Sequence, residues 1–202
     1  MAEGILLIIS GPSGVGKGTV CRHLLTIREN VVLSVSTTTR PPRPSEEEGK
    51  EYNFTSIGQF KKMIKEGLFL EWAVVHGHYY GTTLDKIEET LSGGDDLILE
   101  IDVQGAAQVR KKVPGAVSVF MAPPSMEALK ERITGRGTED SARIKQRLVT
   151  AAQEMDAYSL YDYVVVNDTV EHAAAVISAI IDAEKCRVSR GARPPGWGGE
   201  SR

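Results

Sequence analysis

Hydrophobic positions along the chain alternate between short apolar runs of strand length and longer stretches with helical spacing. The candidate strands are Ile5–Ile9, Val31–Ser36, Leu97–Asp102, Val117–Met121 and Tyr163–Val166. Helical patterns between and after the later strands cover Gln104–Val113, Ser125–Ile133, Ala142–Met155 and Glu171–Lys185. Strands separated by helices of this length predict βαβ units, and hence an α/β fold with a parallel sheet and helices on both faces.

Two segments interrupt this alternation. Thr37–Leu91 contains a candidate strand at Leu68–Val75 and a predicted turn around Gly77–Gly81. It has too much structure for a loop and too little for an independent core, so we expect an inserted subdomain. The second interruption, Arg132–Arg147, is cationic. The tail from Arg187 is rich in Gly, Pro, Arg and Ser, a composition that predicts disorder.

The first apolar run leads directly into a glycine-rich segment, and a helical pattern follows. The segment consists of Gly11, Pro12, Ser13, Gly14, Val15, Gly16, Lys17, Gly18 and Thr19. Its glycines allow successive N–H groups to face one anion, and its lysine can reach the outer phosphates of a nucleotide. The alternative is a tight turn without ligand, but a cation at a helix N-terminus is disfavoured unless an anion is bound. The segment therefore predicts a phosphate-binding loop and a P-loop NTPase-type sheet.

Composition limits the possible partners. The 202 residues are 41% hydrophobic and 25% charged, with a net charge of −3, as in ordinary globular proteins. That charge argues against a general nucleic-acid binder. The cysteines, Cys21 and Cys186, have no metal-ligand spacing, and no apolar run reaches the ~18 residues of a membrane span. We expect a cytoplasmic protein with no nucleic-acid polymer and no membrane among its partners.

Clustered arginines suggest further phosphate contacts. Arg40 and Arg43 flank two prolines, and planar guanidinium groups suit phosphate recognition. A solvated basic turn offset by Glu46–Glu48 is the alternative. Arg132 and Arg136 are four residues apart, and Arg147 lies beside a buried helical stripe; a solvated face is the usual meaning of such arginines. With the loop lysine, these arginines would suit a reaction that gathers several phosphates.

Three acidic residues are further candidates for the ligand site. Glu100 and Asp102 come at the end of a predicted buried strand, where a carboxylate points into the ligand crevice of an open α/β sheet. Capping of the next helix is the alternative for such an acid. Glu71 interrupts an apolar strand; it could be paired structurally, or it could accept two N–H bonds from a guanine edge.

At this point the sequence resembles the guanylate kinases, which transfer the γ-phosphoryl group of ATP to GMP. The resemblance runs from Ile8 to about Ile181 and rests on several separated motifs in order. They are Gly11–Lys17, Ser34–Arg43, Gly49–Phe54, Phe69–Ala73, Tyr79–Thr82, Ile98–Gly105, Arg136–Thr138 and Tyr163–Asp168.

The resemblance implies a guanylate kinase-like domain over residues 1–186. Its core would comprise residues 1–36, 92–124 and 161–186, with a GMP-binding insertion over 37–91, a lid over 125–160 and a disordered tail over 187–202. It also implies an ATP:GMP phosphotransferase of purine nucleotide metabolism that accepts GMP and dGMP, and either a monomer or a homodimer.

The resemblance assigns site residues as well. ATP would contact the loop from Gly11 to Thr19 together with Arg132, Arg136 and Asn167. GMP would contact Ser36, Arg40, Arg43, Tyr52, Glu71, Tyr80, Thr82 and Asp102, with Ser36, Glu71 and Thr82 reading the guanine. The catalytic groups would be Lys17, Arg40, Arg136 and Arg147, acting by positioning and charge neutralisation. Asp102 would contact either GMP or the shell of a magnesium ion.

Gly18 departs from the common P-loop pattern, which has a Ser or Thr hydroxyl at this position. Thr19 lies one residue further on, turned by roughly 100° around the helix. We therefore expect Mg²⁺ to be held mostly by nucleotide phosphates and water, with Asp102 in the outer shell.

Two alternatives remain at this stage. A kinase of the same fold could use AMP or a pyrimidine monophosphate as acceptor, although the guanine-reading set argues against it. A non-catalytic guanylate-kinase-like module of a scaffold protein would typically have a degraded phosphate loop, which this chain does not.

Overall fold

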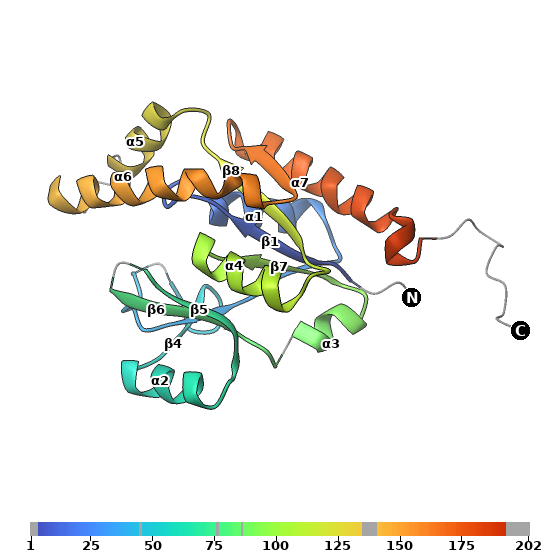
Figure 1. The fold of residues 1–202 in the computed structure, drawn as a ribbon, viewed down its shortest axis with the longest axis horizontal. Coiled ribbons are helices and arrows are strands. Elements are labelled where there is room, and N and C mark those ends of the chain that lie inside the picture. Colours follow the sequence, from blue (N-terminus) through green and yellow to red (C-terminus); the bar gives the residue numbers. More distant parts are fainter. Residues whose placement is uncertain (1–3, 45, 76, 86, 135–140, 193–202) are drawn as a thin grey trace, which may run out of the picture.

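The computed structural model describes residues 4–44, 46–75, 77–85, 87–134 and 141–192. Its larger sheet has the strand order β2-β7-β1-β8-β9 (Figure 1). These strands are β1 (Leu6–Ser10), β2 (Val31–Leu33), β7 (Asp96–Glu100), β8 (Val117–Ala122) and β9 (Tyr163–Val166). All neighbouring pairs are parallel. The predicted α/β class with a parallel sheet is therefore confirmed.

Helices cover both faces of this sheet. Leu7 and Ile9 of β1 belong to a core cluster with residues of α1 (Lys17–Ile27) and α7 (Val170–Lys185). Leu6 and Ile8 belong to a second cluster with residues of α4 (Val103–Lys112). Because successive side chains of a strand point to opposite faces, β1 is apolar throughout and buried on both sides.

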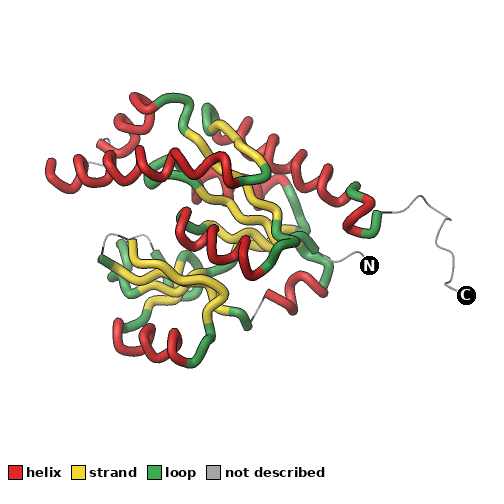
Figure 2. The backbone as a smooth tube through the Cα atoms, viewed as in Figure 1, coloured by secondary structure: helices red, strands yellow, loops and turns green. Residues whose placement is uncertain are grey.

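A second, four-stranded sheet has the order β4-β3-β6-β5. Its strands are β3 (Ser36–Thr38), β4 (Tyr52–Phe54), β5 (Phe69–Val75) and β6 (His78–Thr83). Helix α2 (Ile57–Lys65) packs on it through Phe60, whose ring stacks on Phe69 at 4.4 Å between centroids. Leu70 of β5 joins the α4 core cluster, so α4 lies between the two sheets (Figure 2). Helix α3 (Ile87–Ser92) leads back to the larger sheet.

The remaining elements follow β8 and β9. They are α5 (Met126–Thr134), α6 (Ser141–Met155), and the 3₁₀ turns η1 (Asp156–Leu160) and η2 (Val188–Arg190). Leu129 of α5 and Ala151 of α6 are fully buried in the first core cluster. These two helices are thus packed on the same body as α1 and α7.

Three sequence predictions were wrong in detail. The strand expected at Val31–Ser36 is divided, because the chain crosses from β2 in one sheet to β3 in the other at residues 34–35. The turn expected over Gly77–Gly81 is short: β6 begins at His78, and Gly77 has the positive φ of 84°. The tail is not structureless from Arg187, because Arg190 donates to Glu184 (2.9 Å) and to the carbonyl of Gly115 (2.8 Å).

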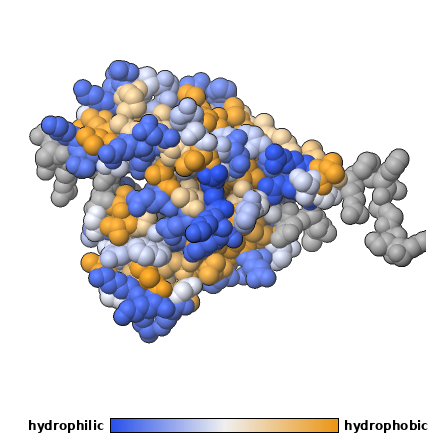
Figure 3. Space-filling model, viewed as in Figure 1, coloured by the Kyte–Doolittle hydropathy of each residue, from blue (hydrophilic) through white to orange (hydrophobic). Residues whose placement is uncertain are grey.

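The surface shown in Figure 3 carries its exposed apolar residues scattered among hydrophilic ones. Scattered exposure of this kind is ordinary for a folded protein. Within the described ranges, no helix combines the length and the apolar character that a bilayer crossing requires.

Asp96 connects β7 to α7 and to the residue that precedes β1, and it provides a stability test. Its fully buried carboxylate accepts from the N–H of Ile5 at 3.0 Å and lies 2.8 Å from the ammonium group of Lys185. Replacement by Ala leaves the Ile5 N–H without its acceptor, so the free energy of unfolding should fall by about 2 kcal/mol. Asp96→Asn keeps one acceptor oxygen, so its free energy of unfolding, measured with urea, should fall by less than that of the Ala variant. Equal stability of all three proteins would contradict this role.

Candidate active site

One cavity joins the two sheets. It has a volume of about 810 Å³. Its lining includes the glycine-rich loop on one side and residues of the smaller sheet on the other, among them Ser36, Glu71 and Tyr80. A cavity of this size and mixed lining is typical of a small-molecule site. The loop and the smaller sheet, far apart in sequence, therefore face the same space.

The glycine-rich loop connects β1 to α1 in the geometry that an anion site requires. Gly11, Gly14 and Gly16 have φ values of 143°, 89° and 99°, which side chains rarely adopt. A Cβ on Gly11 would also lie 2.2 Å from the carbonyl oxygen of Met121. Gly16 is the N-cap of α1, so no side chain caps the first-turn amides. Lys17 donates to the carbonyl of Gly11 at 2.7 Å, which places its ammonium group over the loop.

Gly18 faces a carboxylate. A Cβ at this position would lie 3.1 Å from Oε2 of Glu100, which accepts from the Gly18 backbone N–H. Burial raises the pKa of Glu100, while Lys17 and Arg22 act in the opposite direction. The space that a hydroxyl-bearing side chain would need is thus limited by Glu100. Thr19 is exposed and lines the cavity.

Helix α6 contacts the loop at Ser13. The Ser13 N–H donates to Glu154 at 3.0 Å, and the Ser13 hydroxyl accepts from Arg147 at 3.1 Å. Arg147 is 7% exposed, so it is not on a solvated face. Burial raises the pKa of Glu154, and the Ser13 N–H partly offsets this. Both α6 side chains line the cavity.

Arg132 and Asn167 lie behind the loop. Both donate to the carbonyl of Val15, at 3.1 Å and 2.7 Å, and Arg132 also donates to the carbonyl of Asn167 at 2.9 Å. Neither is among the described residues that line the cavity. The structure therefore gives them contacts that fix the shape of the loop. Arg136, predicted to act beside them, lies outside the described residues.

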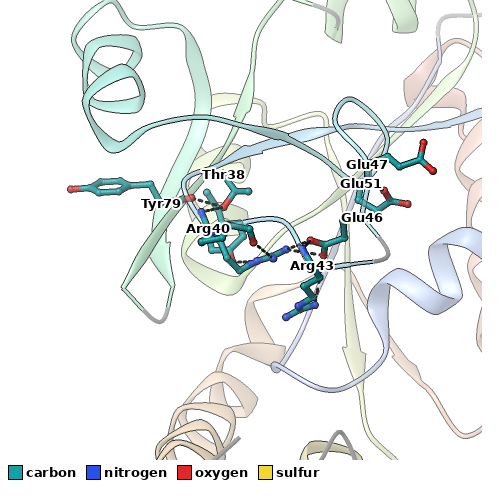
Figure 4. Close-up of polar contacts among 9 residues, drawn as sticks. Thr38, Arg40, Arg43, Glu46, Glu47, Glu51 and Tyr79 are labelled. Carbon is teal, nitrogen blue, oxygen red and sulfur yellow. Dashed lines mark hydrogen bonds and ion pairs between the residues drawn. The ribbon is translucent and has the colours of Figure 1, made fainter. Parts of the chain in front are cut away.

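Arg40, Arg43, Tyr52 and Tyr80 form one group of side chains, and Figure 4 shows its two arginines. Arg40 donates from Nε to the Tyr80 hydroxyl at 3.2 Å, and its guanidinium lies 5.4 Å from the Tyr52 ring centroid. Burial raises the pKa of Tyr52 to about 12, so its hydroxyl stays protonated at neutral pH. Arg43, Glu46, Tyr52 and Tyr80 line the cavity. Arg40 is not among the described lining residues and contacts Glu46.

Glu71 is the buried acid of the smaller sheet. It is 3% exposed and accepts from the Thr82 hydroxyl at 2.7 Å, because the two residues are paired across β5 and β6. Burial raises the pKa of Glu71 to about 7. A Cβ on Gly105 would lie 2.4 Å from the second carboxylate oxygen, so only glycine fits beside it.

Asp102 also lies at the cavity, as the N-cap of α4. One carboxylate oxygen accepts from the Gly105 N–H at 2.9 Å and the other from the Gln104 amide at 3.2 Å. The helix-capping role considered for this acid is therefore present, and the carboxylate still lines the cavity. Asp102 lies beyond the end of β7 rather than within it.

The sequence did not single out Glu46, Gly105 or Glu154 individually. Glu46 and Gly105 stood within stretches that were noted for other reasons, as part of an acidic run and as the end of a motif. Glu154 contacts Ser13 across 141 residues of sequence. No local pattern indicates a contact of that range.

Comparison with known proteins agrees with this geometry. The family model described as guanylate kinase matches residues 3–184. The chain is 50% identical to a guanylate kinase of Caldanaerobacter subterraneus subsp. tengcongensis, covering 93% of this chain and 91% of that protein. It is 49% identical to a guanylate kinase of Shouchella clausii over 93% of this chain and 92% of the relative.

Among solved structures, a guanylate kinase from Anaplasma phagocytophilum superposes with a TM-score of 0.80 at 37% identity, covering 94% of this chain and 90% of that one. The SH3-kinase fragment of tight junction protein 3 shares the fold alone, with a TM-score of 0.50 at 10% identity over 93% of this chain and 60% of that chain. The loop, the buried acid of the smaller sheet and these similarities lead to one conclusion: the chain belongs to the guanylate kinase family.

Proposed function

We propose that this chain is an ATP:GMP phosphotransferase that transfers the γ-phosphoryl group of ATP to GMP in purine nucleotide metabolism. The observation that carries the proposal is the buried Glu71, which accepts from the Thr82 hydroxyl and lines the same cavity as the glycine-rich loop. A phosphate loop alone indicates a donor site. A buried carboxylate across the cavity indicates in addition a site for the nucleotide that accepts the phosphoryl group, whose base would donate N–H groups to this carboxylate.

Guanine fits the acceptor end of the cavity. Its N1–H and 2-amino groups would donate to Glu71, with Ser36 and Thr82 contacting other edge atoms. Adenine presents the opposite pattern at that edge and would leave the buried carboxylate unpaired. Such mispairing costs several kcal/mol, which is enough to exclude AMP without an editing step. Because Ser36, Glu71 and Thr82 would contact the base and not the sugar, dGMP should also be accepted.

The phosphates would meet between the two halves of the cavity. The amides of the loop and Lys17 would hold the ATP phosphates, with Arg147 and Arg136 beside them. Arg40, Arg43, Tyr52 and Tyr80 would hold the phosphate of GMP. Catalysis then consists mainly of positioning two like-charged reactants and neutralising the charge that spreads during transfer. The lid expected over residues 125–160 stays a prediction, as do the cytoplasmic location and the choice between monomer and homodimer.

Mg²⁺ is the implied cofactor. Among the described residues no cluster of three or more His, Cys, Asp or Glu side chains could hold a metal ion. Glu100 and Asp102 nevertheless line the cavity beside the loop, and carboxylate oxygens suit Mg²⁺. We therefore assign these two residues to its water shell, with the phosphates as direct ligands. When bound, the ion would neutralise phosphate charge. Gly18 supplies no hydroxyl ligand.

An acceptor panel with ATP tests the guanine assignment. GMP and dGMP should turn over rapidly, and AMP, CMP and UMP at less than about 1% of their kcat/KM, since a lost buried hydrogen-bond pair gives discrimination of this order. Comparable rates with AMP would place the chain among kinases with another acceptor. No turnover of any acceptor would favour the non-catalytic scaffold module.

Lys17→Ala tests the donor half. Loss of one oriented cation at the transferring phosphate should lower kcat by at least ~100-fold. Lys62→Ala is the matched control, because that side chain is 65% exposed on α2. Steady-state kinetics with GMP saturating would measure both variants. Full activity of Lys17→Ala would contradict the role of this lysine.

The raised pKa of Glu71 gives a pH test. Below the pKa of about 7 the carboxyl is protonated, and it cannot accept both guanine donors. GMP affinity of the wild type should therefore rise relative to that of Glu71→Gln by about tenfold between pH 6 and pH 8.

The phosphate of GMP itself titrates near pH 6 and changes the affinity of both proteins. The ratio of wild type to Glu71→Gln cancels this effect. The groups facing Glu71 include Asp102, which raises its pKa further, and Lys112, which lowers it. A flat affinity ratio in titration calorimetry would contradict the coupling between ionisation of Glu71 and GMP binding in this pH range.

A further inference from the structure

The carboxylate of Glu46 contacts both Arg40 and Arg43, the two arginines proposed to hold the phosphate of GMP. Nη2 of Arg40 donates to both oxygens of Glu46, at 2.8 Å and 2.9 Å. The backbone N–H of Arg43 donates to the same carboxylate at 2.8 Å, and its guanidinium lies 3.8 Å away. Figure 4 shows Glu46 between the two arginines. This acid belongs to a stretch that sequence reasoning treated only as an offset to a basic turn.

Burial distinguishes Glu46 from its acidic neighbours. Its side chain is 9% exposed and that of Arg40 13%, whereas the nearby Lys50–Glu47 pair is 66% and 65% exposed. Burial by itself would raise the pKa of Glu46, but the hydrogen bonds from Arg40 and Arg43 lower it. Glu46 is therefore an ionised group in a partly dehydrated setting, where ion pairs are stronger than at the surface.

The backbone fixes this carboxylate in place. The Glu46 N–H donates to the Arg43 carbonyl at 3.0 Å, so the turn between residues 43 and 46 is closed in both directions. On the other side, the Arg40 N–H donates to the Thr38 hydroxyl at 3.2 Å, which donates to the Tyr79 carbonyl at 2.9 Å. Displacing Glu46 would open the turn and leave the Arg43 N–H and Nη2 of Arg40 without the carboxylate that they contact.

Charge gives the reason for such an arrangement. Two guanidinium groups held close together repel each other while no phosphate is bound. A carboxylate between them removes that repulsion and leaves the guanidinium of Arg43, whose side chain is 60% exposed, directed at the cavity. Arg40 is held at the same time with its Nε on the hydroxyl of Tyr80, which lines the cavity.

We propose that Glu46 is a positioning residue that holds Arg40 and Arg43 at the spacing required by the phosphate of the acceptor nucleotide. The inference rests on the proposed function, because it assumes GMP as the acceptor. Glu46 touches no reacting atom. It sets the affinity for the monophosphate through the two arginines and the Tyr80 hydroxyl.

Glu46→Gln tests the proposal, because it keeps the size of the side chain and removes its charge. The KM and Kd for GMP should rise by about tenfold, the order expected for loss of a charge-assisted contact. The KM for ATP and kcat at saturating GMP should change by less than about twofold, since such a change reflects ground-state binding of one substrate. Glu47→Gln, on the same loop and exposed, is the matched control and should behave as wild type.

Guanosine separates positioning from a general loosening of the subdomain. It lacks the phosphate, so its Kd should be equal for wild type and Glu46→Gln. Equal weakening of guanosine and GMP would overturn the proposal. So would tighter GMP binding by the variant, which would mean that the carboxylate competes with the phosphate, or unchanged GMP binding. If Glu46→Gln melts earlier than wild type, Glu46→Asp repeats the test with the charge retained and should bind GMP more tightly than Glu46→Gln does.

The same titrations separate this proposal from the function itself. Failure of the wild type to bind GMP would overturn the proposed function. Wild-type binding with an unaffected Glu46→Gln would overturn only the positioning role.

Discussion

The architecture of this cavity depends on one electrostatic constraint: a site built for several phosphates must remain stable when no phosphate is present. Its cations and free N–H groups would otherwise repel one another or lack partners. The described structure meets this constraint with carboxylates. Glu46 holds two arginines, Glu154 accepts from the loop at Ser13, and Glu100 accepts from Gly18. Ser13, Gly18 and the turn that carries Arg40 and Arg43 therefore each contact an internal carboxylate. In the proposed function, nucleotide phosphates would exchange or extend these contacts.

Much of the fold was predictable because its signals are local. The strand at Tyr163–Val166 has the predicted bounds, and the helices at residues 103–112 and 170–185 begin one position before their predicted starts. Continuous apolar runs predict burial on both faces for β1, β7 and β9. The two core clusters confirm this for β1 and β7. For β9 the prediction was wrong, because Val164 and Val166 are 49% and 46% exposed. The division of Val31–Ser36 between two sheets was not predictable, because strand propensity does not say which sheet a strand joins. That outcome is decided by tertiary pairing of β2 with β7 and of β3 with β6.

The candidate site was predictable to the extent that its chemistry follows sequence motifs. The glycine-rich loop and Glu71 were singled out from residue type and position, whereas Thr82 was assigned only through the resemblance to the guanylate kinases. Cross-strand pairing brings Glu71 and Thr82 together. The partners that orient such residues were not identified, since in the sequence an acidic residue that contacts an arginine cannot be distinguished from other surface acidic residues. Arg132 and Asn167, which the resemblance assigned to ATP, both contact the Val15 carbonyl behind the loop. Their role toward ATP stays a prediction, and the motifs did not indicate this contact with the loop.

Two buried carboxylates show how the same residue type serves stability or recognition. Asp96 receives the Ile5 N–H and faces the ammonium of Lys185, so its charge is compensated within the protein. Glu71 is buried to a similar degree, yet burial raises its pKa to about 7 and Thr82 is the hydroxyl donor beside it. Gly105 brings no side chain to the other oxygen, from which a Cβ would lie only 2.4 Å away. Thr82 supplies hydrogen bonds to Glu71 through the hydroxyl and the backbone N–H. In the proposed function guanine would supply two further donors. Selectivity for guanine would follow from the cost of leaving a buried carboxylate without them, which a base that lacks both donors would not relieve.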